Sequence, residues 1–152
     1  MKHSVNLVVD APTGTVGDVL ADLGTYPQWN DLVQAASPIE VSSGELLAWL
    51  TTLRAQVGPL ARSKQLRFVR TVDDVANNGS RNVRFERQEV DGRQHAAWVM
   101  ETTVRPRDGD QTEVTLDLSY EGGLWMPALA GVLGNAIERA TSRLPAYVAS
   151  LT

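Results

Sequence analysis

The most regular hydrophobic pattern in the chain lies in its last thirty residues. Gly122 to Ile137 contains no charged side chain, and an amphipathic stretch follows it. The apolar positions recur mostly at intervals of three and four, as on a helix with one buried face; they are Met126, Leu129, Val132, Leu133, Ile137, Ala140, Leu144, Val148 and Leu151. The uncharged stretch is shorter than the roughly 20 residues that span a bilayer. We therefore predict a long helix packed on an apolar surface of the same protein.

The chain before this helix shows mostly the alternation of apolar and polar residues that is typical of β-strands. The clearest strand is 112–121, where Val114, Leu116, Leu118 and Tyr120 alternate with polar residues. The other predicted strands are 4–9, 32–41, 45–57, 60–72, 82–90 and 95–105, and a polar loop is expected over 73–80. Gly58-Pro59 and Asp91-Gly92 are hairpin-turn signals between adjacent strands.

A short helix is predicted between the first two strands. Val16, Val19, Leu20 and Leu23 recur there at helical spacing, and 24–30 breaks the pattern with room for one more helical turn. The predicted order is a strand, one or two short helices, about six strands and a long helix. This order predicts an α+β protein in which a curved antiparallel sheet of about seven strands wraps on the C-terminal helix. The space between sheet and helix is the natural ligand site.

Length and composition fit one domain over residues 1–152. The chain has 43 % hydrophobic and 21 % charged residues, as in an ordinary folded protein. The absence of cysteine excludes disulfides and thiolate chemistry. The apolar run at the start of the chain is too short for a signal peptide, so we expect a cytoplasmic protein.

The net charge of −4 argues against nucleic acid as a partner, but the charge is unevenly distributed. Residues 54–107 hold 11 of the 14 basic and 6 of the 18 acidic side chains. The densest basic cluster comprises Arg54, Arg62, Lys64, Arg67 and Arg70. These residues either form solvated strand faces or a landing patch for an acidic headgroup, an anionic ligand or an acidic partner.

Two motifs near the start of the chain point to a known family. Val5 to Pro12 contains the end of the first strand and an alanine-proline pair after it, and Asp22 to Asn30 ends in the sequence Tyr-Pro-Gln-Trp-Asn. This pair resembles the opening of the START-like helix-grip superfamily, in particular its bacterial polyketide cyclase/dehydrase and lipid-transport group. The resemblance implies an apolar cavity under the last helix and a structural, plug-like role for Trp29. It does not imply one function, because the superfamily includes carriers, aromatases, hormone receptors and partner-binding proteins.

The sequence lacks the patterns of metal sites and of nucleophilic catalysis. His3 and His95 are far apart and have no neighbouring ligand motif, so we expect no metal. No nucleophile-plus-base motif, phosphate-binding loop or dinucleotide fingerprint is present, and we expect no cofactor. Asp73 and Asp74 are adjacent carboxylates in a predicted exposed loop, and we assign them no catalytic role.

The candidate ligand-binding residues come from three strands and the long helix. Phe85 and Arg87 share one face of their strand by parity, and so do Trp98 and Met100. If that face is concave, Arg87 places a cation in a mostly apolar site, where it must pair or bind an anionic ligand group. Otherwise Arg87 is an exposed arginine at a strand end. The full candidate set is Phe85, Arg87, Trp98, Met100, Leu118, Tyr120, Met126, Leu129, Leu133 and Ile137. Gly131 and Gly134 lie three apart in the helix and indicate either close packing or room for a ligand.

Three functional hypotheses follow from this reading. The leading hypothesis is binding or transport of a lipid, isoprenoid or polyketide-like molecule without covalent chemistry. The first alternative is a polyketide cyclase, aromatase or dehydratase in which Arg87 or Tyr120 polarises the substrate. The second is a module that recognises a protein partner through the basic middle of the chain. None of the three requires stable membrane insertion.

Overall fold

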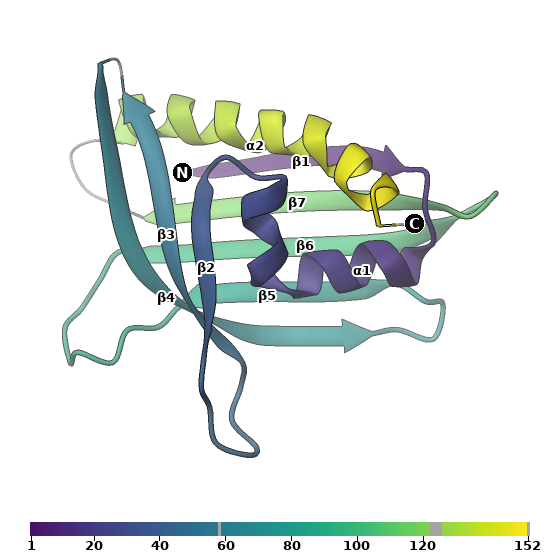
Figure 1. Ribbon diagram of the computed structural model, residues 1–152, viewed down its shortest axis with the longest axis horizontal. Coiled ribbons are helices and arrows are strands. Elements are labelled where there is room, and N and C mark those ends of the chain that lie inside the picture. The colour runs from purple at the N-terminus through teal and green to yellow at the C-terminus, as the bar shows by residue number, and fades with distance from the viewer. Residues whose placement is uncertain (58, 122–125, 152) are drawn as a thin grey trace.

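The protein, described here from a computed structural model, is one antiparallel sheet with helices on its concave side (Figure 1). The structure describes residues 1–57, 59–121 and 126–151, and at 56, 57, 60, 126–130 and 140 it describes the backbone only. The strands are β1 (Lys2–Val9), β2 (Val33–Ile39), β3 (Ala48–Val57), β4 (Leu60–Val75), β5 (Arg81–Arg87), β6 (Ala97–Arg107) and β7 (Gln111–Glu121). The helices are α1 (Thr13–Ala21), the 3-10 helix η1 (Leu23–Gln28) and α2 (Met126–Ala149).

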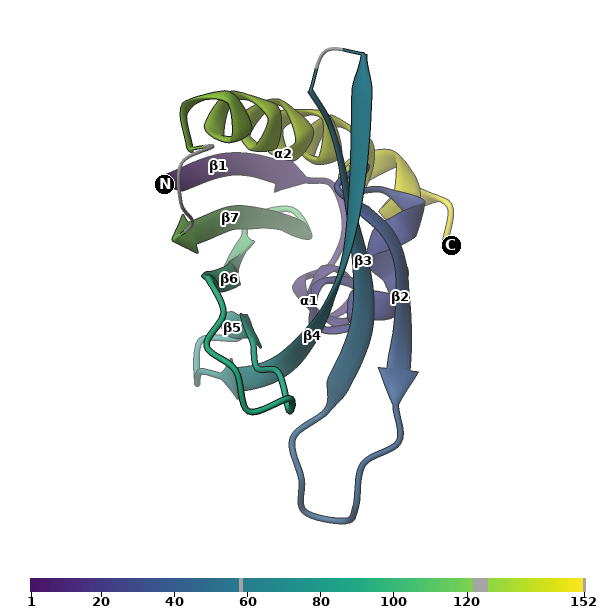
Figure 2. The ribbon, with the colours of Figure 1, turned by 90° about the vertical axis from the view of Figure 1, so that its left-hand side faces the viewer.

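The sheet closes most of the way around the helices. Its strand order is β1-β7-β6-β5-β4-β3-β2, so β2 to β7 form a meander and β1 pairs with β7. Figure 2 shows β1, β7, β6 and β5 forming one wall and β4, β3 and β2 the other, with α2 across the open side. Helix α2 packs on β1 and β3, one strand in each wall. The helix therefore spans the concave face instead of lying along its central strands.

The structure confirms the predicted fold class, but several strands begin or end at other residues than predicted. The predicted strand 45–57 begins only at Ala48. The predicted strand 60–72 continues to Val75, and Asp73 pairs with Val83 in the ladder, so the polar loop is shorter than expected. The hairpin predicted around Asp91-Gly92 is replaced by a nine-residue connection, 88–96, between β5 and β6. Polar residues at these strand ends left the local pattern ambiguous.

The core lies between the concave face and the helices. Its largest fully buried side chains include Tyr26 and Trp29 around η1 and Phe68 and Phe85 on the central strands. The Tyr26 and Trp29 rings have centroids 4.6 Å apart, and the Tyr26 ring meets Phe85 edge-on at 6.0 Å. This aromatic contact fixes η1 against the middle of the sheet, as a plug of the concave face would require.

Arg81 connects α1 to the sheet at the opposite end of β5 from Arg87. Its Nε and Nη2 donate to the two carboxylate oxygens of Asp73 at 2.7 and 2.9 Å, and Nη1 donates to Asp18 at 2.8 Å. Its side chain is 18 % exposed and that of Asp73 is 23 % exposed. Gly17 lets the helix approach, because a Cβ there would lie 3.2 Å from Cδ of Arg81. Asp73 is thus a structural partner of Arg81.

Candidate functional site

The predicted strand residues form two neighbouring rows across the concave face. Phe85 pairs with Met100 and Met100 with Leu118, which makes one row over β5, β6 and β7. Trp98 pairs with Tyr120 in the next row, and their ring centroids lie 4.3 Å apart. Because strand side chains alternate between faces, both rows point to the same side of the sheet.

Arg87 continues the second row onto β5. It pairs with Phe68 of β4, and the register that pairs Glu86 with Val99 makes Arg87 and Trp98 the next positions along their strands. The Arg87 side chain is only 4 % exposed. A guanidinium therefore lies at the end of an otherwise apolar and aromatic surface.

Helix α2 supplies the opposite wall of the site. Leu133 and Ile137 are buried, as are Ala136, Leu144 and Val148 at helical spacing from them. The side chains of Met126 and Leu129, which complete the predicted set, lie outside the described part of the structure. The structure thus brings Leu133 and Ile137 together with the strand residues in one core, while their role in ligand binding stays a prediction.

A small pocket of about 30 Å³ lies between η1, β6, β7 and α2. Its lining includes the predicted residues Met100, Leu118 and Ile137 and also Tyr26, Trp29 and Asn30, which were not predicted as site residues. Tyr26 donates its hydroxyl to the Leu20 carbonyl at 2.9 Å, and burial raises the pKa of this phenol far above its usual range. Tyr26 is therefore a neutral, hydrogen-bonded wall residue. Only its aromatic character and the Tyr-Pro-Gln-Trp-Asn motif marked it in the sequence.

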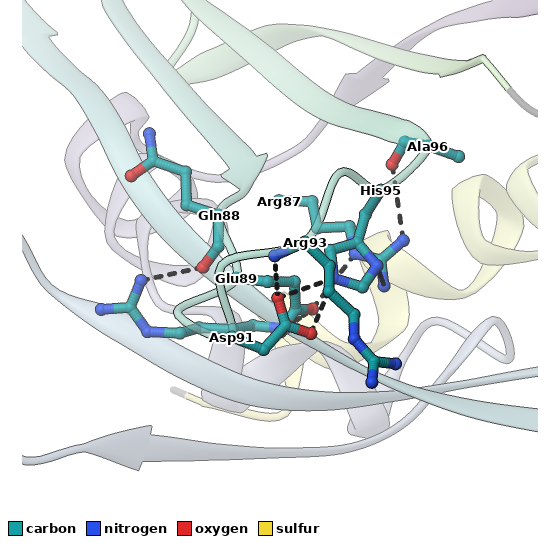
Figure 3. Close-up of polar contacts among 8 residues, drawn as sticks. Arg87, Gln88, Glu89, Asp91, Arg93, His95 and Ala96 are labelled. Atoms are coloured by element: carbon teal, nitrogen blue, oxygen red, sulfur yellow. Dashed lines mark hydrogen bonds and ion pairs between the residues drawn. The ribbon is translucent and has the colours of Figure 1, made fainter.

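A polar cluster surrounds Arg87 where β5 passes into the 88–96 connection (Figure 3). Nε of Arg87 donates to Oε1 of Glu89 at 3.1 Å, and Nη1 donates to the carbonyl of Ala96 at 3.4 Å. Nη2 lies 3.3 Å from Nδ1 of His95. Because a guanidinium has no acceptor, Nδ1 must accept this hydrogen bond, and the His95 proton is then on Nε2. Arg87 is thus held from three sides.

Three further carboxylate contacts hold the connection in place. Nε2 of His95 lies 2.8 Å from Oδ2 of Asp91, and the backbone N–H of Arg93 donates to Oδ1 of Asp91. The Arg93 N–H and the contact with His95 lower the pKa of Asp91. On the inner side, Glu89 also accepts the backbone N–H of Arg67 at 3.0 Å. The sequence predicted neither Glu89 nor His95 as a site residue, because their partners meet only when the connection folds back.

The two helix glycines have different surroundings. A Cβ on Gly134 would lie 3.3 Å from the ring of His3 on β1, whereas one on Gly131 would meet nothing within 4 Å. Gly134 therefore permits close packing of α2 on β1, and the ligand-clearance explanation does not apply to it. Among the described residues, no group of three or more histidine, aspartate or glutamate side chains could hold a metal ion.

The basic cluster of the middle of the chain is divided between different structural roles. Arg67 donates to the carbonyl of Gln88 in the 88–96 connection. Arg70 donates to the carbonyl of Ala21 at the end of α1 and lies over the Trp49 ring. These two side chains of β4 bind separate parts of the fold, and neither is a free member of a landing patch.

Comparison with known proteins identifies the fold. No family model matches the chain, and no curated protein matches its sequence. Human StAR-related lipid transfer protein 5 matches with a TM-score of 0.81 at 12 % identity over 97 % of this chain and 75 % of that one. A START superfamily protein from Mycobacterium smegmatis matches with a TM-score of 0.72 at 19 % identity over 99 % of both chains.

A third structure, a STAR-related lipid transfer protein from Xanthomonas axonopodis, matches with a TM-score of 0.63 at 18 % identity over 93 % of this chain and 84 % of that one. The chain therefore has the START-like helix-grip fold, as its opening motifs indicated. At these identities the similarity defines the fold alone. Within the described residues, no helix is both long and apolar enough to cross a membrane.

Proposed function

We propose that this protein, as a single domain over 1–152, binds and carries a hydrophobic or amphipathic small molecule between the sheet and α2. The observation that carries the proposal is the continuous apolar and aromatic inner face, with Phe85, Met100 and Leu118 in one row beside Trp98 and Tyr120. Ligand sites are typically lined in this way, with few polar groups that fix orientation. The START-like fold supports the same assignment.

Binding of such a ligand must enlarge the space seen in the structure. The described pocket of about 30 Å³ holds a group the size of one water molecule, whereas sites for larger ligands take about 300–1,000 Å³. Because α2 takes no part in the hydrogen-bonded ladder, it can move away from the concave face without breaking the sheet. We therefore expect the ligand to displace α2 from the concave face.

The test is a fluorescence titration with N-phenyl-1-naphthylamine, a neutral apolar probe. We expect saturable binding by the native protein and at least about tenfold weaker binding by Met100→Trp, because the larger ring fills the pocket. Val99→Trp is the matched control, because Val99 lies on the other face of β6 and should leave the affinity unchanged. Absence of saturable binding by the native protein would refute the proposal, and equal weakening by both variants would place the site elsewhere.

An enzymatic role in polyketide cyclisation, aromatisation or dehydration is the alternative, and the buried guanidinium of Arg87 favours it. A carrier needs Arg87 only for ligand preference, whereas a cyclase needs it to stabilise developing negative charge. Arg87→Met should abolish turnover of a polyketide-like substrate but preserve binding if the protein is an enzyme. Turnover by the native protein would overturn the carrier assignment.

A further inference from the structure

The charge of Arg87 is already compensated inside the protein. Glu89 lies 3.1 Å from Nε, and its side chain is 19 % exposed. Its Oε1 also accepts the backbone N–H of Arg67, so the carboxylate is fixed to β4 as well as to the guanidinium. Moving Glu89 away from Arg87 would break two hydrogen bonds and leave both charges poorly solvated.

Arg87 nevertheless keeps hydrogen-bonding capacity. A guanidinium has five N–H donors, and Glu89, His95 and Ala96 occupy one donor on each of the three nitrogens. Among the described residues the remaining N–H of Nη1 and that of Nη2 have no acceptor. By strand register Arg87, which carries these two groups, is the next position of the row that contains Trp98 and Tyr120. They can donate to an oxygen of a ligand lying on that row.

The pair therefore offers hydrogen bonds without a net positive charge. A ligand hydroxyl, carbonyl or ester oxygen can accept from Arg87 and adds no charge to the site. A ligand carboxylate would add a second negative charge beside Glu89, and a buried carboxylate without its own cation is strongly disfavoured. His95 cannot supply that cation in the observed arrangement, because its Nδ1 accepts from Arg87.

We propose that the site selects neutral amphipathic ligands with a hydroxyl, carbonyl or ester group, and that Glu89 is the specificity-determining residue that excludes carboxylates. This inference rests on the proposed binding function and reverses the expectation that Arg87 binds an anionic ligand group. Glu89 acts as the internal counter-ion of Arg87. Its removal should convert the site into one for anionic ligands.

The experiment compares two probes with the same polyene chain, cis-parinaric acid and its methyl ester, by fluorescence titration at pH 8, where the acid is ionised. The native protein should bind the ester at least about tenfold more tightly than the acid. Glu89→Gln should bind the acid at least about tenfold more tightly than the native protein does and keep its affinity for the ester within about threefold.

The matched control is Glu86→Gln, which removes the same charge from the nearby end of β5. Glu86 pairs with Arg84, and its neighbour across the ladder is Val99 on the other face of the sheet. The ratio of the two affinities should stay within about twofold of the native ratio, since Glu86 lies on the other face of the sheet and its charge is paired with Arg84. An equal change in Glu86→Gln and Glu89→Gln would show a general charge effect and overturn the proposal.

The removal of Glu89 leaves Arg87 without its counter-ion, so the Glu89→Gln variant should unfold at a lower temperature than the native protein. A double variant, Arg87→Met with Glu89→Gln, removes both charges and should again prefer the ester. Equal binding of acid and ester by the native protein, or a preference of the double variant for the acid, would overturn the specificity proposal alone. Failure of the native protein to bind either probe would overturn the binding function with it.

Discussion

Arg81 provides the sharpest test of how the short helix α1 is held on the sheet. Arg81→Met keeps most of the hydrocarbon chain and removes the two hydrogen bonds to Asp73 and the one to Asp18. The Asp18 side chain is 80 % exposed, so its contact contributes little. The Asp73 pair is bidentate and mostly shielded from water, and we assign it about 2 kcal/mol of the free energy of unfolding.

This loss should lower the melting temperature by about 4–8 °C in a chain of this length. The free energy of unfolding is measured by urea unfolding, followed by tryptophan fluorescence. A double-mutant cycle with Asp73→Asn isolates the interaction energy between Arg81 and Asp73. Arg105→Met is the control: Arg105 lies 3.7 Å from Glu113 and both side chains are about half exposed. Its loss should change the free energy of unfolding by less than about 0.5 kcal/mol.

The pH dependence of the stability difference between the native protein and Arg81→Met separates the effect of the lost charge from that of altered packing. The hydrogen bond from Arg81 holds the pKa of Asp73 below its ordinary value of 3.8. A depressed carboxyl pKa stabilises the folded state above the unfolded-state pKa, and this contribution is lost as pH falls through the lower folded-state pKa. The difference between native protein and Arg81→Met should therefore shrink below about pH 3.8. A difference that is absent at pH 7, or unchanged at pH 3, would refute the reasoning.

Two further outcomes follow from the structure. Gly134→Leu should reduce the free energy of unfolding by about 1–3 kcal/mol, because the new side chain collides with His3, while the folded fraction binds the apolar probe normally. Adding His3→Ala should recover part of this loss of stability. A loss of probe affinity without a loss of stability would instead place Gly134 at the ligand. Dialysis against EDTA should leave the melting temperature unchanged, because the described residues contain no metal-binding group; a decrease with stoichiometric zinc or iron by elemental analysis would contradict this.

Local periodicity in the sequence was sufficient to predict most elements of the fold. The alternation over 112–121 and the helical spacing after Met126 each reflect one buried face of a regular element. These patterns therefore predict the element whatever partner covers its buried face. Strand parity also placed Phe85 and Arg87 on one face, and both side chains are buried in the structure. These features depend on neighbours within a few residues.

Tertiary contacts decided what surrounds the predicted residues. His95 reaches Arg87 only because the 88–96 connection folds back, and Tyr26 enters the pocket wall only because η1 packs on the central strands. The side chain that meets Gly134 comes from His3, at the other end of the chain. Sequence pattern records which face of an element is apolar, but the partner of a buried charge depends on the path of the whole backbone. The chain alone therefore predicted a cation on the inner face, and only the folded structure showed that Glu89 neutralises it.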